Sequence, residues 1–252
     1  MNEPTRTTQF VHTHICVCEG SLSTHFTGTR SPRAAAADMP SRWLAQHKAD
    51  FYVREAMRLG YRTRAAFKLL QLDARLKKPP LLKRGGVALE LGAAPGSWTQ
   101  VLVQRGMEVV AVDLLPSEPV SGATFVCGDF THAPVQRQLL DLLGDRKIDL
   151  LLSDMSPNRS GHGSLDESRL VDLIEQSLPL AELSLRPRGS AVWKALQGQE
   201  LMLLMKRIKK QFDSASLIKP PASRQGSREI YLCARGFKPL SQTSAGSGSE
   251  SG

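Results

Sequence analysis

Four side chains that can hold or move protons lie in short motifs spread along the sequence: Lys68, Asp154, Lys194 and Glu229. Asp154 and Lys194 each close a short apolar run, and the carboxyl ends of parallel strands meet at one edge of a sheet. A carboxylate beside a lysine at that edge can position a hydroxyl group as a nucleophile. A buried lysine without such a partner is costly, so Lys194 taken alone could equally be a surface lysine that reaches water.

A glycine-containing turn points to a nucleotide site. The apolar run 87–91 leads into Gly-Ala-Ala-Pro-Gly at 92–96 and then into a helix. Glycine lets the backbone approach a ligand closely, and open α/β sheets bind nucleotides in the crevice at their strand ends. The turn matches neither GxGxxG nor a P-loop, which argues against a dinucleotide or ATP as the ligand.

Acidic residues end the next two strands. Asp113 lies 17 residues after Gly96 and can accept hydrogen bonds from both hydroxyls of a ribose. Asp129 can accept a bond from the exocyclic amine of adenine, with Phe130 beside it for packing. Either aspartate could instead only cap a helix. The turn and the two acids in this order favour an adenosyl ligand, and S-adenosylmethionine, which carries positive charge, suits an acidic crevice.

Short apolar strands alternate with helices through most of the chain. Helices are expected at 43–59, 63–76, 98–104, 135–143, 166–185 and 200–211. Strands are expected at 87–91, 109–113, 124–127, 148–153, 190–194, 216–219 and 229–234. The pattern predicts an α/β, doubly wound, Rossmann-like domain with a mainly parallel seven-stranded sheet and helices on both faces.

The charge is distributed unevenly along the 252 residues, which have a net charge of +9. Residues 41–84 carry 12 Lys/Arg against 3 Asp/Glu, and residues 206–238 carry 9 against 2. Residues 85–205 between them carry 9 against 15. Two basic segments around an acidic middle favour a polyanion such as nucleic acid as partner, although a generically basic protein remains an alternative. No apolar run approaches the roughly 20 residues that span a bilayer.

The two ends of the chain differ from the middle in composition. We expect 1–40 to be a poorly ordered extension, 41–240 to be the folded α/β domain with basic N-terminal helices, and 241–252 to be a flexible Ser/Gly-rich tail. The extension could be a tail, a presequence or an over-extended start before Met39. The compartment is accordingly expected to be the bacterial cytoplasm, with the mitochondrial matrix as the alternative.

We expect no metal site. The alternating residues His12, His14, Cys16 and Cys18 lack a partner motif with zinc spacing elsewhere in the chain. The four cysteines of the whole chain are also too few and too scattered for a disulfide framework, which favours a reducing compartment.

In its motifs the chain resembles the FtsJ-like (RrmJ-type) ribosomal RNA large-subunit 2′-O-methyltransferases. The resemblance runs from about residue 41 to 238, and the order of its motifs is highly specific. The segments that carry it are Arg62-Thr-Arg-Ala-Ala-Phe-Lys-Leu, Leu91-Gly-Ala-Ala-Pro-Gly-Ser-Trp, Asp113-Leu-Leu-Pro, Gly128-Asp-Phe, Leu152-Ser-Asp-Met-Ser-Pro-Asn, the strand ending at Lys194, Lys219-Pro and Ser227-Arg-Glu-Ile-Tyr. One departure is Arg188, which stands where glycine is typical.

The resemblance implies a Lys-Asp-Lys-Glu tetrad at Lys68, Asp154, Lys194 and Glu229. It implies S-adenosylmethionine as cofactor, with contacts at Gly96, Trp98, Asp113, Asp129 and Asp154. The implied substrate is a uridine ribose of large-subunit ribosomal RNA, methylated on the assembled subunit by a monomeric enzyme.

Two other functions remain open from the sequence. A non-catalytic RNA-binding ribosome-assembly factor could keep the same fold, but it would have no need for an intact tetrad. A 2′-O-methyltransferase of transfer RNA or the messenger cap is also possible, although a cap pocket needs stacking aromatics, and the chain has three Trp and three Tyr. Whether Lys194 acts as a neutral base or as a charged group that orients the hydroxyl is also left open.

Overall fold

The fold is known from a computed structural model, which describes residues 15–16, 50–76, 78–157 and 161–239. The expected C-terminal tail lies outside the described residues. So do the expected N-terminal extension, except 15–16, and the first part of the expected helix 43–59.

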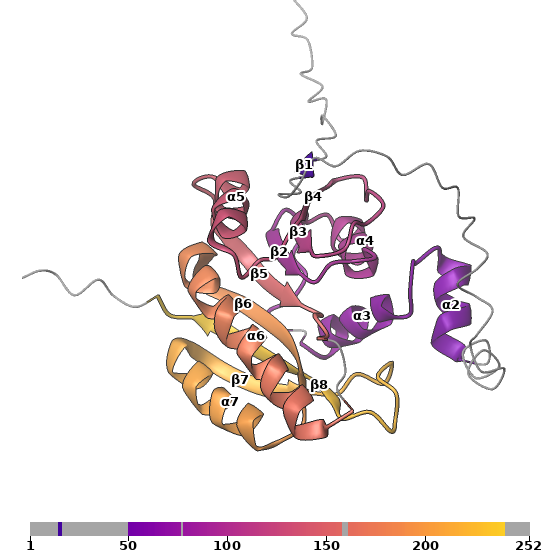
Figure 1. Cartoon of the computed structure of the whole chain (residues 1–252). Coiled ribbons are helices and arrows are strands. Elements are labelled where there is room, and N and C mark those ends of the chain that lie inside the picture. The colour runs from indigo at the N-terminus through magenta and orange to yellow at the C-terminus, as the bar shows by residue number, and fades with distance from the viewer. Residues whose placement is uncertain (1–14, 17–49, 77, 158–160, 240–252) are drawn as a thin grey trace, which may run out of the picture.

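Within the described residues, eight strands form one sheet in the order β1-β4-β3-β2-β5-β6-β8-β7 (Figure 1). Their bounds are β1 Ile15–Cys16, β2 Val87–Leu91, β3 Glu108–Asp113, β4 Ala123–Cys127, β5 Ile148–Ser153, β6 Leu185–Leu196, β7 Phe212–Ile218 and β8 Glu229–Phe237. The pairs from β1 to β6 are parallel, whereas β8 pairs antiparallel with both β6 and β7. The mainly parallel seven-stranded sheet is confirmed, with the two-residue β1 added at its edge.

Helices cover both faces of the sheet (Figure 1). Their bounds are α2 Phe51–Leu59, α3 Ala65–Arg75, α4 Ser97–Gln104, α5 Ala133–Leu143, α6 Gly163–Ser184 and α7 Gln199–Gln211. Buried side chains of α3 and α4 pack in one core with one face of the sheet, and those of α5, α6 and α7 pack in a second core with the other face. The doubly wound arrangement is confirmed.

The alternation of side chains along β6 directs Lys194 to the α3 face. Trp193 and Ala195 are buried in the α5–α7 core, whereas Val192 is buried in the α3–α4 core. Successive side chains of a strand point to opposite faces, so Lys194 shares the face of Val192. Its partner across the antiparallel pair is Tyr231, which lies in the same core.

The strand β6 begins earlier than the expected 190–194. Its register with β5 shifts between Ile148↔Leu185 and Leu150↔Ser190, so that residues 186–189 bulge opposite a single β5 residue, Asp149. The sequence Arg-Pro-Arg-Gly of this bulge has the composition of a turn, which is why a strand was not expected there.

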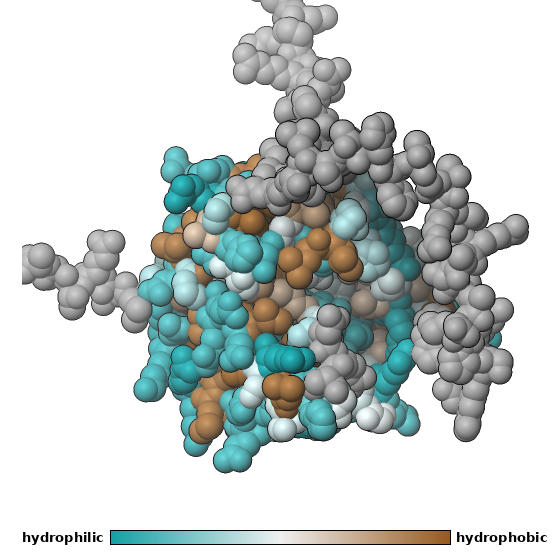
Figure 2. Space-filling view, in the orientation of Figure 1, coloured by the Kyte–Doolittle hydropathy of each residue, from teal (hydrophilic) through white to brown (hydrophobic). Residues whose placement is uncertain are grey.

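The exposed apolar side chains do not form a continuous band on the face shown in Figure 2, where they lie in separate groups among hydrophilic residues. Two of the most exposed are Leu114 and Leu115, directly after β3, at 67% and 65% exposure. No helix in the described residues is long and apolar enough to cross a membrane.

We predict that Arg188→Gly stabilises the fold. Arg188 has a φ of 64°, in the left-handed region, where a side chain costs about 1–2 kcal/mol. Glycine removes that strain but gains entropy in the unfolded chain, so the free energy of unfolding in urea should rise by up to about 1 kcal/mol. Arg186→Gly is the matched control and should destabilise, because Arg186 pairs with Asp149 at 2.5 Å. A loss of stability in Arg188→Gly would contradict the strain argument.

Candidate active site

The structure brings Lys68, Asp154, Lys194 and Glu229 together from four separate elements. The ammonium nitrogen of Lys194 lies 3.2 Å from Asp154 Oδ1 and donates to the Asp154 carbonyl at 3.2 Å. It lies 3.9 Å from Glu229 Oε2. The Lys68 ammonium lies 2.8 Å and 3.0 Å from the two oxygens of Glu229, so Glu229 lies between the two lysines.

This cluster is largely shielded from water. The side chains of Lys194 and Lys68 are 12% exposed, that of Glu229 is 14% and that of Asp154 is 17%. Buried charges are retained at tolerable cost only when they are paired, and here two ammonium groups face two carboxylates. Each side chain is therefore held in place by its neighbours before any ligand binds.

Tyr231 holds Asp154, a role that the sequence did not reveal. Its hydroxyl donates to Asp154 Oδ1 at 2.6 Å, and its ring lies 5.7 Å from that of Trp98 and 5.9 Å from the Lys68 ammonium. Burial, reinforced by the Asp154 charge, raises the pKa of Tyr231 well above its usual value, so the phenol keeps the proton that it donates. The sequence did contain a signal for this role: Tyr231 follows Glu229 by two residues on the same strand, so both side chains point to the same face of the sheet.

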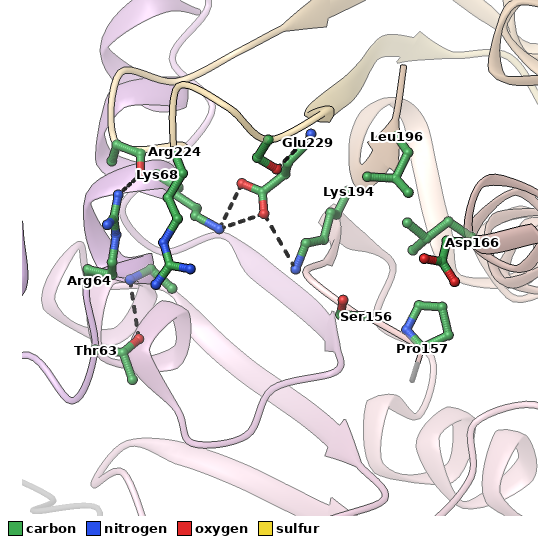
Figure 3. Close-up of a pocket in the computed structure, with 14 residues that line it drawn as sticks. Thr63, Arg64, Lys68, Ser156, Pro157, Asp166, Lys194, Leu196, Arg224 and Glu229 are labelled. Carbon is green, nitrogen blue, oxygen red and sulfur yellow. Dashed lines mark hydrogen bonds and ion pairs between the residues drawn. The ribbon is translucent and has the colours of Figure 1, made fainter. Parts of the chain in front are cut away.

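A cavity of about 280 Å³ opens beside Lys194. Figure 3 shows Lys68, Thr63, Arg64 and Arg224 on one side of it and Pro157 on the other, with Lys194 and Glu229 between them. This cavity is the candidate site for the acceptor substrate.

A second cavity, of about 410 Å³, lies at the carboxyl ends of β2, β3 and β4. Its lining includes the acids Asp113, Asp129 and Asp154, and the apolar Leu114, Leu115 and Phe130. Acidic groups beside apolar side chains fit a ligand with a hydroxylated sugar, a flat ring and a positive charge.

The two predicted cofactor acids are oriented by the backbone. Asp113 accepts from the Ala94 amide at 2.8 Å with one oxygen and from the Leu115 amide at 2.9 Å with the other. Asp129 Oδ1 accepts from the amide and the hydroxyl of Thr131 at 2.9 Å and 2.7 Å. Asp129 thus makes the local bonds of a simple cap, yet both carboxylates also line the cavity and keep lone pairs for a ligand.

Gly92 shapes the turn beneath this cavity. Its φ is 75°, and a Cβ there would lie 2.4 Å from the side chain of Met155, so only glycine fits. Gly96 and Trp98, by contrast, are not among the residues that line the cavity. The Trp98 indole lies on the inner face of α4, is 2% exposed, and donates to the Ala65 carbonyl at 2.8 Å. The cofactor contacts expected at Gly96 and Trp98 stay predictions.

Arg62 clamps the turn from the side of Gly96, another contact that the sequence did not reveal. Its guanidinium donates to the carbonyls of Pro95, Glu118 and Pro119 at 2.5 to 2.7 Å. A Cβ at Gly96 would lie 2.5 Å from that guanidinium. Arg62 therefore joins the glycine turn to the loop after β3.

The two cavities meet at the catalytic candidates. Ser156 and Pro157 line both, Asp154 lines the larger one, and Lys194 lines the smaller one. The Lys194–Asp154 ion pair therefore bridges from one cavity to the other. A group bound in the larger cavity and a substrate in the smaller one would face each other across this pair.

Glu90 is a buried acid on β2, the strand that leads into the glycine turn. It is 2% exposed and accepts from the Thr99 hydroxyl at 2.7 Å. Burial raises the pKa of Glu90 to about 8, against the Thr99 hydrogen bond, and the charges of Asp154 and Asp113 add to the rise. No group of three His, Cys, Asp or Glu among the described residues could hold a metal ion, and of the alternating His/Cys motif only Cys16 is among them.

The model of the FtsJ-like methyltransferase family matches residues 61–237, which include both cavities and the four clustered side chains. The chain belongs to the FtsJ-like methyltransferase family. It is 44% identical over 199 residues to ribosomal RNA large subunit methyltransferase E of Gluconobacter oxydans, covering 79% of this chain and 73% of that protein. It is 41% identical over 196 residues to the protein of the same name from Dechloromonas aromatica, covering 77% and 94%.

Solved structures agree on the fold of this FtsJ-like methyltransferase. A crystal structure described as a ribosomal RNA methyltransferase from Plasmodium falciparum superposes with a TM-score of 0.64 at 27% identity, over 71% of this chain and all of that one. A protein of Streptococcus thermophilus described as a hemolysin shares the fold alone, with a TM-score of 0.52 at 18% identity, over 71% of this chain and 68% of that one.

We predict that Glu90→Gln removes a pH dependence of stability. The unfolded chain releases the Glu90 proton near pH 4.5, but the folded protein holds it up to about pH 8. The contribution of Glu90 is therefore fully present at low pH and is lost as the pH rises through about 8, on the order of a few kcal/mol. Urea unfolding across this range should show a decline in the wild type that is smaller in the variant. Parallel curves for the two proteins would contradict the prediction.

Proposed function

We propose that this FtsJ-like enzyme transfers the methyl group of S-adenosylmethionine to the 2′-hydroxyl of a ribose in large-subunit ribosomal RNA. The observation that carries the proposal is the Lys194–Asp154 pair at the junction of two cavities. The names of the 41–44% identical relatives support the substrate. Their bacterial origin supports the bacterial cytoplasm as the compartment.

The larger cavity has the donor set that this cofactor needs. Asp113 can accept from ribose hydroxyls, and Asp129 from the adenine amine, next to the Phe130 ring. Leu114 and Leu115 supply apolar surface for the adenine. Asp154 offers a negative charge to the positively charged methionine end. When bound, S-adenosylmethionine supplies an electrophilic methyl group.

The residues around Lys194 position the acceptor. Lys194 Nζ, held by Asp154 and Glu229, lies at the wall of the smaller cavity and can hydrogen-bond the ribose 2′-oxygen. Tyr231 fixes Asp154, and Lys68 fixes Glu229. Such pre-organisation supplies much of the rate in a displacement, because the oxygen is held in line before reaction. The hydroxyl proton leaves either to Lys194 as a neutral base, or to Asp154 while a charged Lys194 orients the oxygen.

Basic side chains at the smaller cavity suit an RNA backbone. Arg64 and Arg224 both line it, and the Arg224 charge contributes to lowering the pKa of Arg64, after burial as the largest cause. Arg64 pairs with Asp50, whereas no ion pair of Arg224 is found among the described residues. An exposed, unpaired guanidinium beside the cavity can bind a phosphate next to the reacting ribose.

The finer points of the substrate are part of the proposal. We propose a uridine as the methylated nucleotide, the assembled large subunit as the physiological substrate, and a monomer as the active form. The rivals are a non-catalytic RNA-binding assembly factor and a 2′-O-methyltransferase of transfer RNA or the messenger cap.

One assay separates these functions. Purified protein and labelled S-adenosylmethionine are incubated separately with large ribosomal subunits, free large-subunit ribosomal RNA, transfer RNA and capped messenger RNA, and labelled riboses are mapped. We expect label at one ribose of the large-subunit RNA, strongest on subunits. Label only on transfer RNA or on the cap would show that this RNA, and not ribosomal RNA, is the substrate. Binding to RNA without any label would support the assembly factor.

We predict that Lys194→Ala lowers kcat at least about 100-fold, because the group that positions or deprotonates the 2′-oxygen is lost. The affinity for S-adenosylmethionine, measured by calorimetry, should change little, since Lys194 does not line the larger cavity. Full activity in this variant would remove Lys194 from the mechanism.

Lys194→Arg separates the two roles of Lys194. A guanidinium stays protonated in proteins, so it can orient an oxygen but cannot accept its proton. Activity well above that of the alanine variant means that a charged group suffices, and activity equal to it assigns the base role to the lysine.

We predict that Arg224→Ala raises KM for the RNA roughly tenfold. The slope of log K against log salt for RNA binding should fall by about one, the amount expected for one lost phosphate contact. The kcat and the affinity for S-adenosylmethionine should remain near those of the wild type. Arg137→Ala is the matched control, since Arg137 is an exposed residue of α5, on the opposite face of the sheet. Equal effects of the two substitutions would refute a specific phosphate contact at Arg224.

A further inference from the structure

We propose that a second basic pocket, away from the catalytic centre, binds phosphate groups of the RNA substrate; this rests on the proposed RNA function. The pocket has a volume of about 220 Å³. Its lining consists of residues from the segment after α3, the β6 bulge and the strands β7 and β8: Lys78, Pro79, Lys83, Arg188, Ser190, Asp213, Ser214, Arg235 and Gly236.

The sheet register locates this pocket relative to Lys194. Ser190 and Ser214 both pair with Arg235, whereas Lys194 pairs with Tyr231. Four residues of β6 separate the two positions, or about 13 Å at 3.3 Å per residue. Ser190 and Lys194 are an even number of residues apart, so they point to the same face of the sheet. Helices α3 and α4 cover the sheet between the two positions, so a single RNA strand would reach both by running over the outer surface on this side of the molecule.

The charges of the pocket select an anion. Lys78, Lys83, Arg188 and Arg235 bring four positive charges, and Asp213 is the acidic residue among the lining residues that the structure describes. Asp213 lies 3.7 Å from Lys238, which partly neutralises it. No ion pair of the four cations is found among the described residues. The Arg235 guanidinium donates to the carbonyls of Lys78 and Pro79, which ties β8 to the segment after α3 and leaves its charge uncompensated by an acid.

The backbone at Arg188 indicates what this position contributes. Its φ of 64° is a conformation that glycine adopts freely, and in the 186–189 bulge the arginine keeps it at a cost. Arg188 is exposed and lines the pocket, so burial of its side chain does not offset that cost. What the position gains over glycine is a guanidinium, the side chain best suited to phosphate oxygens.

A polyanion fits the pocket better than a free ion. The cations are spread over three chain segments; Lys78 and Arg188 are exposed, and Lys83 and Arg235 are half-buried. The same face already carries Arg224 and Arg64 beside the catalytic centre. Phosphates repeated along an RNA strand match two such groups of cations, and each contact releases counterions.

The test compares the wild type with the triple variant Lys78→Gln, Lys83→Gln, Arg188→Gly, which replaces the left-handed arginine by the residue that tolerates this backbone. Binding to transcribed large-subunit ribosomal RNA is measured over a series of salt concentrations. We expect about tenfold weaker binding at low salt, and a slope of log K against log salt reduced by about two, at roughly 0.7 per lost contact to a single strand. In methyl transfer, KM for the RNA should rise while kcat stays the same.

The controls separate this inference from the proposed function. Arg137→Gln removes an exposed charge on the opposite face, and an equal loss there would overturn a specific site. An unchanged slope in the triple variant would overturn the pocket while wild-type methyl transfer still supports the function. RNA binding that depends on the pocket without methyl transfer by the wild type would support the pocket and overturn the function. Loss of inorganic phosphate binding alone, with RNA affinity intact, would make it an ion site and refute the proposal.

Discussion

Two opposite charges held out of water, on Lys194 and Asp154, constrain the rest of this structure. An ammonium group with 12% exposure is tolerable only beside a carboxylate, and a carboxylate so placed needs its other lone pairs satisfied. Tyr231 meets that need for Asp154, and Lys68 balances Glu229. The four elements that supply these groups must therefore keep a common register, and the sheet with α3 packed on it does so. The cluster is part of the core as much as it is a reaction centre.

The sequence predicted the fold well where apolar runs have clear ends. Strands 87–91 and 148–153 were predicted at their observed bounds, because each is a short apolar segment between polar residues. The start of β6 was missed because the bulge 186–189 has the composition of a turn although it continues a strand. The antiparallel direction of β8 could not be predicted from the sequence. It follows from the insertion of β8 between β6 and β7, which depends on tertiary packing and not on local residue pattern.

The site was predictable by residue type but not by contact. A strand-end lysine and a strand-end acid are visible in a sequence, whereas the hydrogen bond from Tyr231 to Asp154 is not, because 77 residues separate them. The direction of the Trp98 side chain was not predictable either, because the packing of α4 against the sheet turns it into the core. The roles of these residues follow from their chemistry, whereas their positions follow from packing.

The direction of β8 has a further consequence. Because β8 runs against β6, its first residue, Glu229, lies beside the end of β6 where Lys194 lies, and Arg235 lies near the opposite end. One continuous strand thus spans the distance between the catalytic cluster and the second basic pocket. A single inserted or deleted residue between Tyr231 and Arg235 would turn one of the two groups to the other face of the sheet. The length of this segment is therefore constrained from both ends, and the spacing of the two sites is a fixed dimension of the molecule.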